Sequence, residues 1–199
     1  MVRQLLNNNK YILTNKRYFL KQFLKEKKTV GSVAPSSKHL AKKMLKDVDF
    51  ENGRVFVELG PGTGVFTREI VKNMNPEAKL FVFELHKPFH DALRQEFENN
   101  KQVIIVNDSA EKICEVINAH NIKNVDAILS SLPLANFNKK LVQEILNNAH
   151  KALKEEGVYV QFQYSLKSKK YIKRVFNNLD LTFTARNLPP AFVYTSEKK

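Results

Sequence analysis

The sequence contains little of what several classes of protein require. It has a single cysteine, Cys114, and only six glycines among 199 residues. One cysteine excludes an intramolecular disulfide and a cysteine zinc cluster. No apolar run approaches the roughly 18 residues that span a bilayer, and the N-terminal residues lack the apolar stretch of a signal peptide. We therefore expect a cytoplasmic protein that is either soluble or peripherally associated with the inner face of the cell membrane.

Basic residues, by contrast, are abundant and unevenly placed. Thirty-three lysines and arginines against 20 acidic residues give a formal charge of +13. Residues 1–50 hold twelve basic and three acidic residues and so contribute +9, whereas residues 51–199 have a nearly ordinary balance. At 43% hydrophobic residues the chain is that of a folded protein. Its charge predicts a negatively charged partner, either nucleic acid or anionic lipid.

The segment 10–28 has the pattern of a basic amphipathic helix. Its large apolar residues recur at spacings of three and four, which places them on one helical face. Such a helix can lie in a membrane interface, where each lysine or arginine contributes about 1 kcal/mol. The residues expected at an anionic membrane are Lys16, Arg17, Phe19, Lys21, Phe23 and Lys25. The alternative is a helix that packs on the domain while its lysines are solvated.

Beyond this segment, helices and strands alternate along the chain. Ser36 or Ser37 is expected to cap a helix that runs to about Lys46. The predicted strands are 54–59, 80–84, 103–107, 125–130, 158–164, 181–185 and 192–195. The predicted helices between them are 65–74, 88–99, 110–120, 139–154 (ended by Gly157) and 169–178. This order predicts an α/β fold, with a mostly parallel seven-stranded sheet and an antiparallel last strand. We divide the chain into a helical extension, 1–50, and a domain, 51–199.

Three of the six glycines, Gly60, Gly62 and Gly64, lie in one five-residue window between a predicted strand and a helix. Glycines there permit a positive φ and the close approach of a ligand to the backbone. Glu84 ends the next strand, where a carboxylate can accept hydrogen bonds from ribose hydroxyls. Asp108 ends the third strand, in a position to flank an adenine. Because ligands of such sheets bind beyond the carboxyl ends of the strands, these residues predict one site.

The spacing of the glycines differs from that of dinucleotide folds, and this part of the sequence resembles the class I S-adenosylmethionine-dependent methyltransferases. The resemblance implies a Rossmann-like fold with S-adenosylmethionine as cofactor and S-adenosylhomocysteine as product. It places the three glycines under the methionine and ribose of the cofactor, and Glu84 on the ribose. It places Asp108, Ser109 and Ala110 near the adenine. The other residues expected against the cofactor are Glu58, Ser131, Ser32 and Ser36.

The fourth predicted strand ends in a segment that faces the transferable methyl group in this fold. Enzymes that methylate an adenine amine carry Asn or Asp, a proline and then Tyr or Phe there, and the ring stacks on the base. This chain has Ser131 in the polar position and Leu134 where the ring is expected, with Phe137 three residues later. Leucine cannot supply base stacking, which is worth roughly 1–3 kcal/mol.

Four segments instead resemble the bacterial phospholipid N-methyltransferase family, which methylates phosphatidylethanolamine. They are residues 30–37, 57–64, 131–134 and 187–191. This resemblance implies methyl transfer to the amine of a phospholipid head group at a membrane surface. The segment 161–166 departs from the family, because only Tyr164 matches an expected Tyr-Gly-Pro-type turn. We expect Ser131, Tyr164 and Tyr18 to orient the amine, and we expect the substrate to contact Leu132, Pro133 and Tyr194.

Two other readings remain open. An rRNA adenine N6-methyltransferase would also explain the charge, and a cofactor-binding membrane module would need no catalysis. No metal site is expected: His86 and His90 are four residues apart, but Pro88 indicates that His86 precedes the helix, and no third ligand stands out.

Of the two possible anionic partners, an anionic membrane with its aminolipid is the favoured one, and nucleic acid is the less favoured one.

Overall fold

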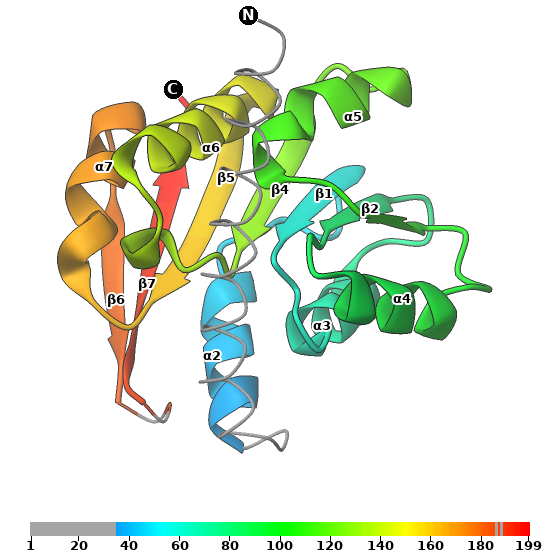
Figure 1. Ribbon diagram of the computed structural model, residues 1–199, viewed down its shortest axis with the longest axis horizontal. Helices are drawn as coiled ribbons and strands as arrows, with labels where there is room; N and C mark the ends of the chain where they lie inside the picture. Colours follow the sequence, from blue (N-terminus) through cyan, green and yellow to red (C-terminus); the bar gives the residue numbers. More distant parts are fainter. Residues whose placement is uncertain (1–34, 186, 188) are drawn as a thin grey trace, which may run out of the picture. The chain divides into compact units, whose positions relative to one another are not determined.

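The computed structural model describes residues 35–185, 187 and 189–199, with only the backbone for residues 35–38. This part of the chain forms seven strands and the helices between them (Figure 1). The strands are β1 (Val55–Leu59), β2 (Lys79–Phe83), β3 (Val103–Val106), β4 (Val125–Ser130), β5 (Leu153–Gln163), β6 (Asp180–Thr184) and β7 (Ala191–Glu197). The helices are α2 (Pro35–Leu45), α3 (Val65–Asn73), α4 (Lys87–Glu96), α5 (Ile113–Ala119), α6 (Lys139–Ala152) and α7 (Lys169–Val175).

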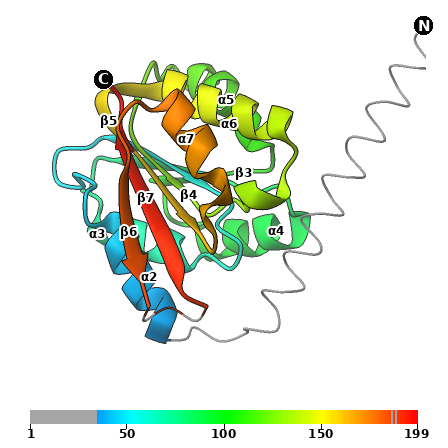
Figure 2. The same ribbon diagram turned by 90° about the vertical axis from the view of Figure 1, so that its left-hand side faces the viewer.

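The strands form one sheet in the order β3-β2-β1-β4-β5-β7-β6. The pairs from β3 through to β5 are parallel, and β7 runs antiparallel to both β5 and β6. The predicted α/β class and the antiparallel pairing of the last two strands are therefore confirmed, and Figure 2 shows these two strands side by side at one edge. The chain winds outward in opposite directions from β1 and β4. Such a switch point is where ligands of open α/β sheets bind.

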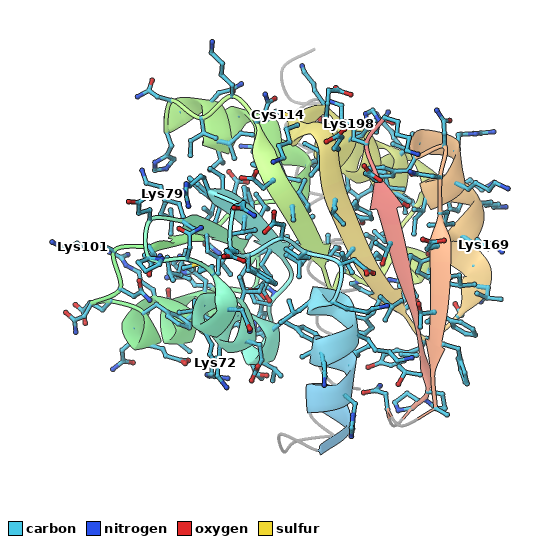
Figure 3. The ribbon with its side chains drawn as sticks, turned by 180° about the vertical axis from the view of Figure 1, so that it is seen from behind. Lys72, Lys79, Lys101, Cys114, Lys169 and Lys198 are labelled. Atoms are coloured by element: carbon cyan, nitrogen blue, oxygen red, sulfur yellow. The ribbon has the colours of Figure 1, made fainter. Side chains whose placement is uncertain are left out.

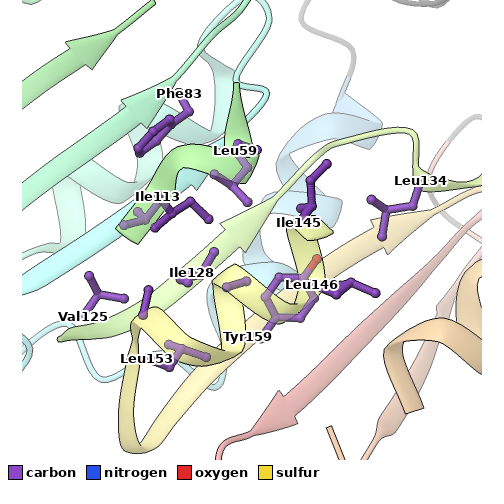
Figure 4. Packing of buried hydrophobic residues seen from close by; sticks show 14 of the residues in the cluster. Leu59, Phe83, Ile113, Val125, Ile128, Leu134, Ile145, Leu146, Leu153 and Tyr159 are labelled. Atoms are coloured by element: carbon purple, nitrogen blue, oxygen red, sulfur yellow. The ribbon is translucent and has the colours of Figure 1, made fainter. Parts of the chain in front are cut away.

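Two hydrophobic clusters cover the two faces of the sheet. One joins the sheet to α5, α6 and α7 and includes Ile113, Ile145 and Ile172; Figure 4 shows part of it. The other joins the sheet to α2, α3 and α4 and includes Met44, Ile70 and Leu93. The two-sided burial explains why the central strands are almost continuously apolar, as expected for parallel strands with helices on both faces.

Helix α2 is part of this second cluster. Leu40, Ala41 and Met44 recur on one face of the helix and are 3%, 1% and 1% exposed. The Nζ atom of Lys43, from the same helix, donates to the carbonyl of Phe183 on β6 at 2.6 Å. The helix begins at Pro35, so Ser36 lies in its first turn and not at its cap. Residues 35–45, which the sequence analysis assigned to the extension, thus pack on the sheet.

The largest difference from the predicted boundaries lies between α6 and β5. We expected the helix after residue 139 to continue to 154 and end at Gly157, but α6 ends at Ala152 and β5 begins directly after it. Glu156 has a positive φ of 63°, and the ladder to β4 is irregular between Val125 and Ala127. The register with β4 passes from Leu153 to Val158, and between them the amide of Glu156 donates to the carbonyl of Lys198 at 2.9 Å. Pairing on both sides of the polar stretch, together with this bond to the C-terminal residues, therefore overrides its helical preference.

The packing of α2 yields a stability prediction. Met44→Ala should lower the free energy of unfolding by about 2–4 kcal/mol, because it removes a buried side chain and leaves a cavity between α2 and the sheet. Lys42→Ala, on the exposed side of the same helix, is the control and should change it by less than about 0.5 kcal/mol. Urea denaturation measures both. Equal effects of the two changes would show that α2 is not part of the folded domain.

Candidate active site

The glycine window forms a tight loop between β1 and α3. Gly60, Gly62 and Gly64 all have positive φ, of 71°, 58° and 78°. At Gly60 a Cβ atom would also lie 2.8 Å from the Cδ2 atom of Leu132, so a side chain has no room there. The amide of Gly60 donates to the carbonyl of Phe83 at 2.9 Å. Glycine is thus required for both the backbone conformation and the close approach to the segment after β4.

Glu84 lies directly against this loop, as the sequence predicted for one common site. Its carboxylate is buried, with the residue 3% exposed. One oxygen accepts from the amide of Gly62 at 3.0 Å, and the other accepts from the amide of His86 at 2.8 Å. Each carboxylate oxygen can accept further hydrogen bonds. The acid is therefore held beside the loop through both oxygens of its carboxylate.

The end of β3 lies next to that of β2. The side-chain amide of Asn107 donates to the carbonyl of Glu84 at 2.8 Å. Asp108 accepts from the amide of Ser109 at 2.7 Å and forms an ion pair with Lys112 at 3.2 Å. This hydrogen-bonded pair raises the pKa of Lys112. The side chain of Ala110 is buried in the core below. Asn107, which we had not predicted, thus connects the second and third strand ends.

Glu58 occupies a different environment from Glu84. It lies on β1 with 1% of its surface exposed. Its alternation with Val57 and Leu59 turns its side chain toward the helix α3 side of the sheet. There it contributes to the raised pKa of Arg68, whose main cause is the hydrogen bond from Arg68 to Glu96. Glu58 is therefore a buried acid whose charge acts on Arg68 of α3.

The segment after β4 is joined to the end of β1. The amide of Ser131 donates to the carbonyl of Leu59 at 2.8 Å, and Ser131 is 4% exposed. The side chain of Leu134 is 2% exposed and lies in the hydrophobic cluster, as Figure 4 shows. Phe137 packs against the same cluster. Ser131 therefore lies at the switch point. The side chain of Leu134 is buried in the core, and that of Phe137 packs against it.

The two predicted tyrosines within the described residues lie in different surroundings. Tyr164 follows β5, is 44% exposed and has its ring edge-on to Phe162, with 5.5 Å between the centroids. Burial of the phenol raises the pKa of Tyr164, so it remains protonated at neutral pH and is a hydrogen-bond partner and not a base. Tyr194 is fully buried, and its hydroxyl donates to the carbonyl of Ser165 at 3.2 Å. Its observed contacts are those of a core residue.

Other predicted residues lie outside the part of the chain that the structure describes. These are Tyr18 and Ser32, the side chain of Ser36, and the six residues expected at the membrane, Lys16, Arg17, Phe19, Lys21, Phe23 and Lys25. Within residues 35–199, apart from the two gaps, no three His, Cys, Asp or Glu side chains cluster as a metal site would require. His86 precedes α4, as expected, and the Nδ1 atom of His90 lies 2.9 Å from Asp91.

Two further residues of this site were missed. Gln161 and Gln163 on β5 are 0% and 5% exposed, and both side-chain amides donate to the carbonyl of Leu132, at 3.1 and 2.7 Å. Their signal was present in the sequence, because two glutamines at alternate positions of an otherwise apolar strand must find buried partners. What the sequence could not show was which group they bind.

The contact between Glu84 and the glycine loop yields a binding prediction. Glu84→Gln should weaken S-adenosylhomocysteine binding by roughly 10- to 100-fold, because it removes charge-assisted hydrogen bonds. Glu77→Gln, whose parent side chain is 80% exposed, is the matched control. Isothermal titration calorimetry gives both dissociation constants. An unchanged constant for the Glu84 variant, with the protein folded, would contradict the assignment.

The sequence matches known methyltransferases. Residues 41–169 match the family model GCD14, described as the tRNA methyltransferase complex GCD14 subunit. The chain is 30% identical over 177 residues to the ornithine lipid N-methyltransferase of Singulisphaera acidiphila, which covers 88% of this chain and 92% of that protein. It is 29% identical over 111 residues to the ribosomal RNA small subunit methyltransferase A of Mycoplasma capricolum, covering 55% of this chain but 40% of that protein.

Solved structures show the same fold. The 16S rRNA N2 G1207 methyltransferase RsmC of T. thermophilus, in complex with AdoMet and guanosine, superposes with a TM-score of 0.64 at 19% identity, over 85% of this chain and 44% of that one. The N-methyltransferase NodS of Bradyrhizobium japonicum, in complex with S-adenosyl-L-homocysteine, superposes with a TM-score of 0.66 at 10% identity, over 84% of this chain and 89% of that one.

The positive-φ glycines and the buried acid beside them fit the same cofactor in this chain. The protein belongs to the class I S-adenosylmethionine-dependent methyltransferases, its residues 41–169 to the family of the GCD14 model, and it is an enzyme with S-adenosylmethionine as its methyl donor.

Proposed function

We propose that this enzyme methylates the aliphatic amine of a lipid head group at a membrane surface. The observation that carries the proposal is the match to the ornithine lipid N-methyltransferase along nearly the whole of both chains. The ribosomal RNA methyltransferase A of Mycoplasma capricolum matches over only 40% of its own length and 55% of this chain. A shared methyltransferase domain explains the second similarity, whereas the first extends beyond it.

Leu134 supports an aliphatic acceptor. At 2% exposure its side chain contributes to the core and offers no surface to a substrate. Phe137, the other candidate for stacking on a base, is held against the same cluster. An adenine acceptor would therefore lack the ring that stacking requires from this segment. An aliphatic amine has no such requirement.

The residues around Ser131 fit the demands of amine methylation. The bound cofactor supplies an activated methyl group. The chain must then orient a neutral amine, and Ser131, fixed by its bond to Leu59, provides a hydroxyl at the switch point. The half-exposed ring of Tyr164 offers an aromatic face to a methylated ammonium product. Since Tyr164 remains protonated, we assign the departing amine proton to water and not to this phenol.

A mixed apolar and cationic surface borders the acceptor side of the sheet. Tyr164, Leu166 and Phe183 are 44%, 47% and 52% exposed. Phe192 of β7 pairs with Gln163 on one side and Phe183 on the other, which brings the ends of β5 and β6 to the same edge. The exposed lysines of the neighbouring helical segment are Lys167, Lys169, Lys170 and Lys173. Exposed rings beside lysines fit an anionic bilayer interface.

The enzyme would dock on the membrane and not span it. No helix in the described ranges is long and apolar enough to cross a bilayer. We propose that the basic segment 10–28 adds to the surface around Leu166 as a second attachment. Both would act from the inner face of the cell membrane, where anionic lipids attract lysine and arginine.

The proposal predicts the product of an assay. With labelled S-adenosylmethionine, the purified full chain should label ornithine lipid or phosphatidylethanolamine presented in anionic vesicles, and leave ribosomal RNA unlabelled. The mass of the lipid product identifies both the head group and the number of methyl groups. Labelled RNA with unlabelled lipid would instead support the alternative function, an rRNA adenine N6-methyltransferase. The sequence segments favour phosphatidylethanolamine, and the match to the Singulisphaera enzyme favours ornithine lipid.

The exposed lysines predict the membrane contact. Lys167→Gln combined with Lys169→Gln should weaken binding to anionic vesicles by about 30-fold, since each lysine contributes about 1 kcal/mol. Lys79→Gln combined with Lys101→Gln is the control with the same charge change. Figure 3 shows Lys79 and Lys101 on the opposite side of the molecule from Lys169. Vesicle co-sedimentation measures both, and an equal loss in the two variants would show that only net charge matters.

A further inference from the structure

One backbone carbonyl in the active-site segment accepts an unusual number of hydrogen bonds. The oxygen of Leu132 accepts from the amide of Leu134 at 2.8 Å. It also accepts from the side-chain amides of Gln161 and Gln163, at 3.1 and 2.7 Å. A carbonyl oxygen has two lone pairs, so three donors leave it no capacity for another.

The two glutamines that supply these bonds are buried on one face of β5. The side-chain carbonyl of Gln161 accepts from the hydroxyl of Tyr159 at 2.9 Å. That of Gln163 accepts from the amide of Ala135 at 3.4 Å. Each glutamine therefore uses both ends of its amide within the protein, and a buried amide without these partners would be costly. The pair connects the end of β5 to residues 132–135.

The next carbonyl of the segment also accepts an internal hydrogen bond. That of Pro133 accepts from the amide of Asn136 at 2.9 Å. With φ −77° and ψ 68°, Pro133 forms the inverse γ-turn that the Leu134–Leu132 bond closes. In the enzymes that methylate an adenine amine, whose motif this segment resembles, a polar side chain and a backbone carbonyl of the segment accept the amine hydrogens. Here the carbonyls of both Leu132 and Pro133 are bonded internally, and Ser131 supplies the side-chain acceptor.

We propose that Gln161 and Gln163 are positioning residues of the methyl-transfer segment. Their amides hold residues 131–135 against β5 and close the Leu132 carbonyl to the substrate. The amine is then oriented through Ser131 without that carbonyl, which disfavours a planar aromatic amine and suits an aliphatic one. The part concerning the amine rests on the proposed function, whereas the holding of the segment does not.

Hydrogen–deuterium exchange tests the holding of the segment without any acceptor. In the full chain with S-adenosylhomocysteine, Gln163→Leu should speed exchange at Leu134 and Ala135 by about tenfold, because the segment loses two of its bonds. Gln143→Leu on α6 is the matched control, since Gln143 bonds to Asn147 on the surface. Unchanged exchange in Gln163→Leu would overturn the proposal whether or not any lipid is a substrate.

Kinetics separate positioning from binding. Gln163→Leu should lower kcat on the aminolipid by about tenfold, while KM for the lipid and Kd for the cofactor change by less than about twofold. If faster exchange were accompanied by an unchanged kcat, the pair would hold the segment without positioning the amine, and that part of the proposal would fall. Wild-type protein that labels no aminolipid would refute the proposed function but leave the exchange result standing.

A second variant keeps the test meaningful if leucine disturbs the fold. Gln163→Glu places a carboxylate opposite the Leu132 carbonyl, and only its protonated form can donate to that oxygen. Burial raises the pKa of such a carboxyl. Its kcat relative to wild type should therefore rise as the pH falls from about 8 to about 6, whereas that of Gln163→Leu should stay constant. A ratio for Gln163→Glu that is independent of pH would contradict the donor role.

Discussion

The carboxyl end of β1 is the constraint on which the site depends. β1 is paired on both sides, and each pairing continues past the strand through one more hydrogen bond. Gly60 donates to Phe83 on one side, and Leu59 accepts from Ser131 on the other. These two bonds hold the glycine loop and the methyl-transfer segment to the same strand end. A cofactor held by the loop and an amine held by the segment would therefore meet at a fixed distance.

From this point the edge of the sheet divides into two halves of different character. The half formed by β1, β2 and β3 presents acids whose oxygens are already held by backbone amides, with Glu84 bonded to Gly62 and His86. The half formed by β4, β5 and β6 presents glutamine amides, a half-exposed tyrosine and lysines. Under the proposed function, the first half would bind the ribose of the cofactor and the second half the lipid amine.

Local patterns of apolar and turn residues in the sequence predicted most of the helices and strands. The strand 125–130 has the predicted bounds, and most of the other predicted strands differ from the observed ones by one or two residues at an end. The exception is the start of β5. Its polar residues have a helical pattern, and they become part of a strand because β4 pairs on either side of them and Lys198, far away in sequence, bonds to Glu156 and Gly157. Non-local pairing of this kind leaves no mark on the segment itself.

The sequence by itself determined that the glycine loop and Glu84 lie together, because Gly60, Gly62, Gly64 and Glu84 each end or follow a strand in the order that parallel pairing requires. The tertiary structure alone decided the surroundings of residues 131–135. It placed Tyr194 in the core, buried Leu134 in the hydrophobic cluster and brought Gln161 and Gln163 to the carbonyl of Leu132. The physical reason is that strand ends follow from local periodicity, whereas the partner of a buried amide is set by which strands become neighbours.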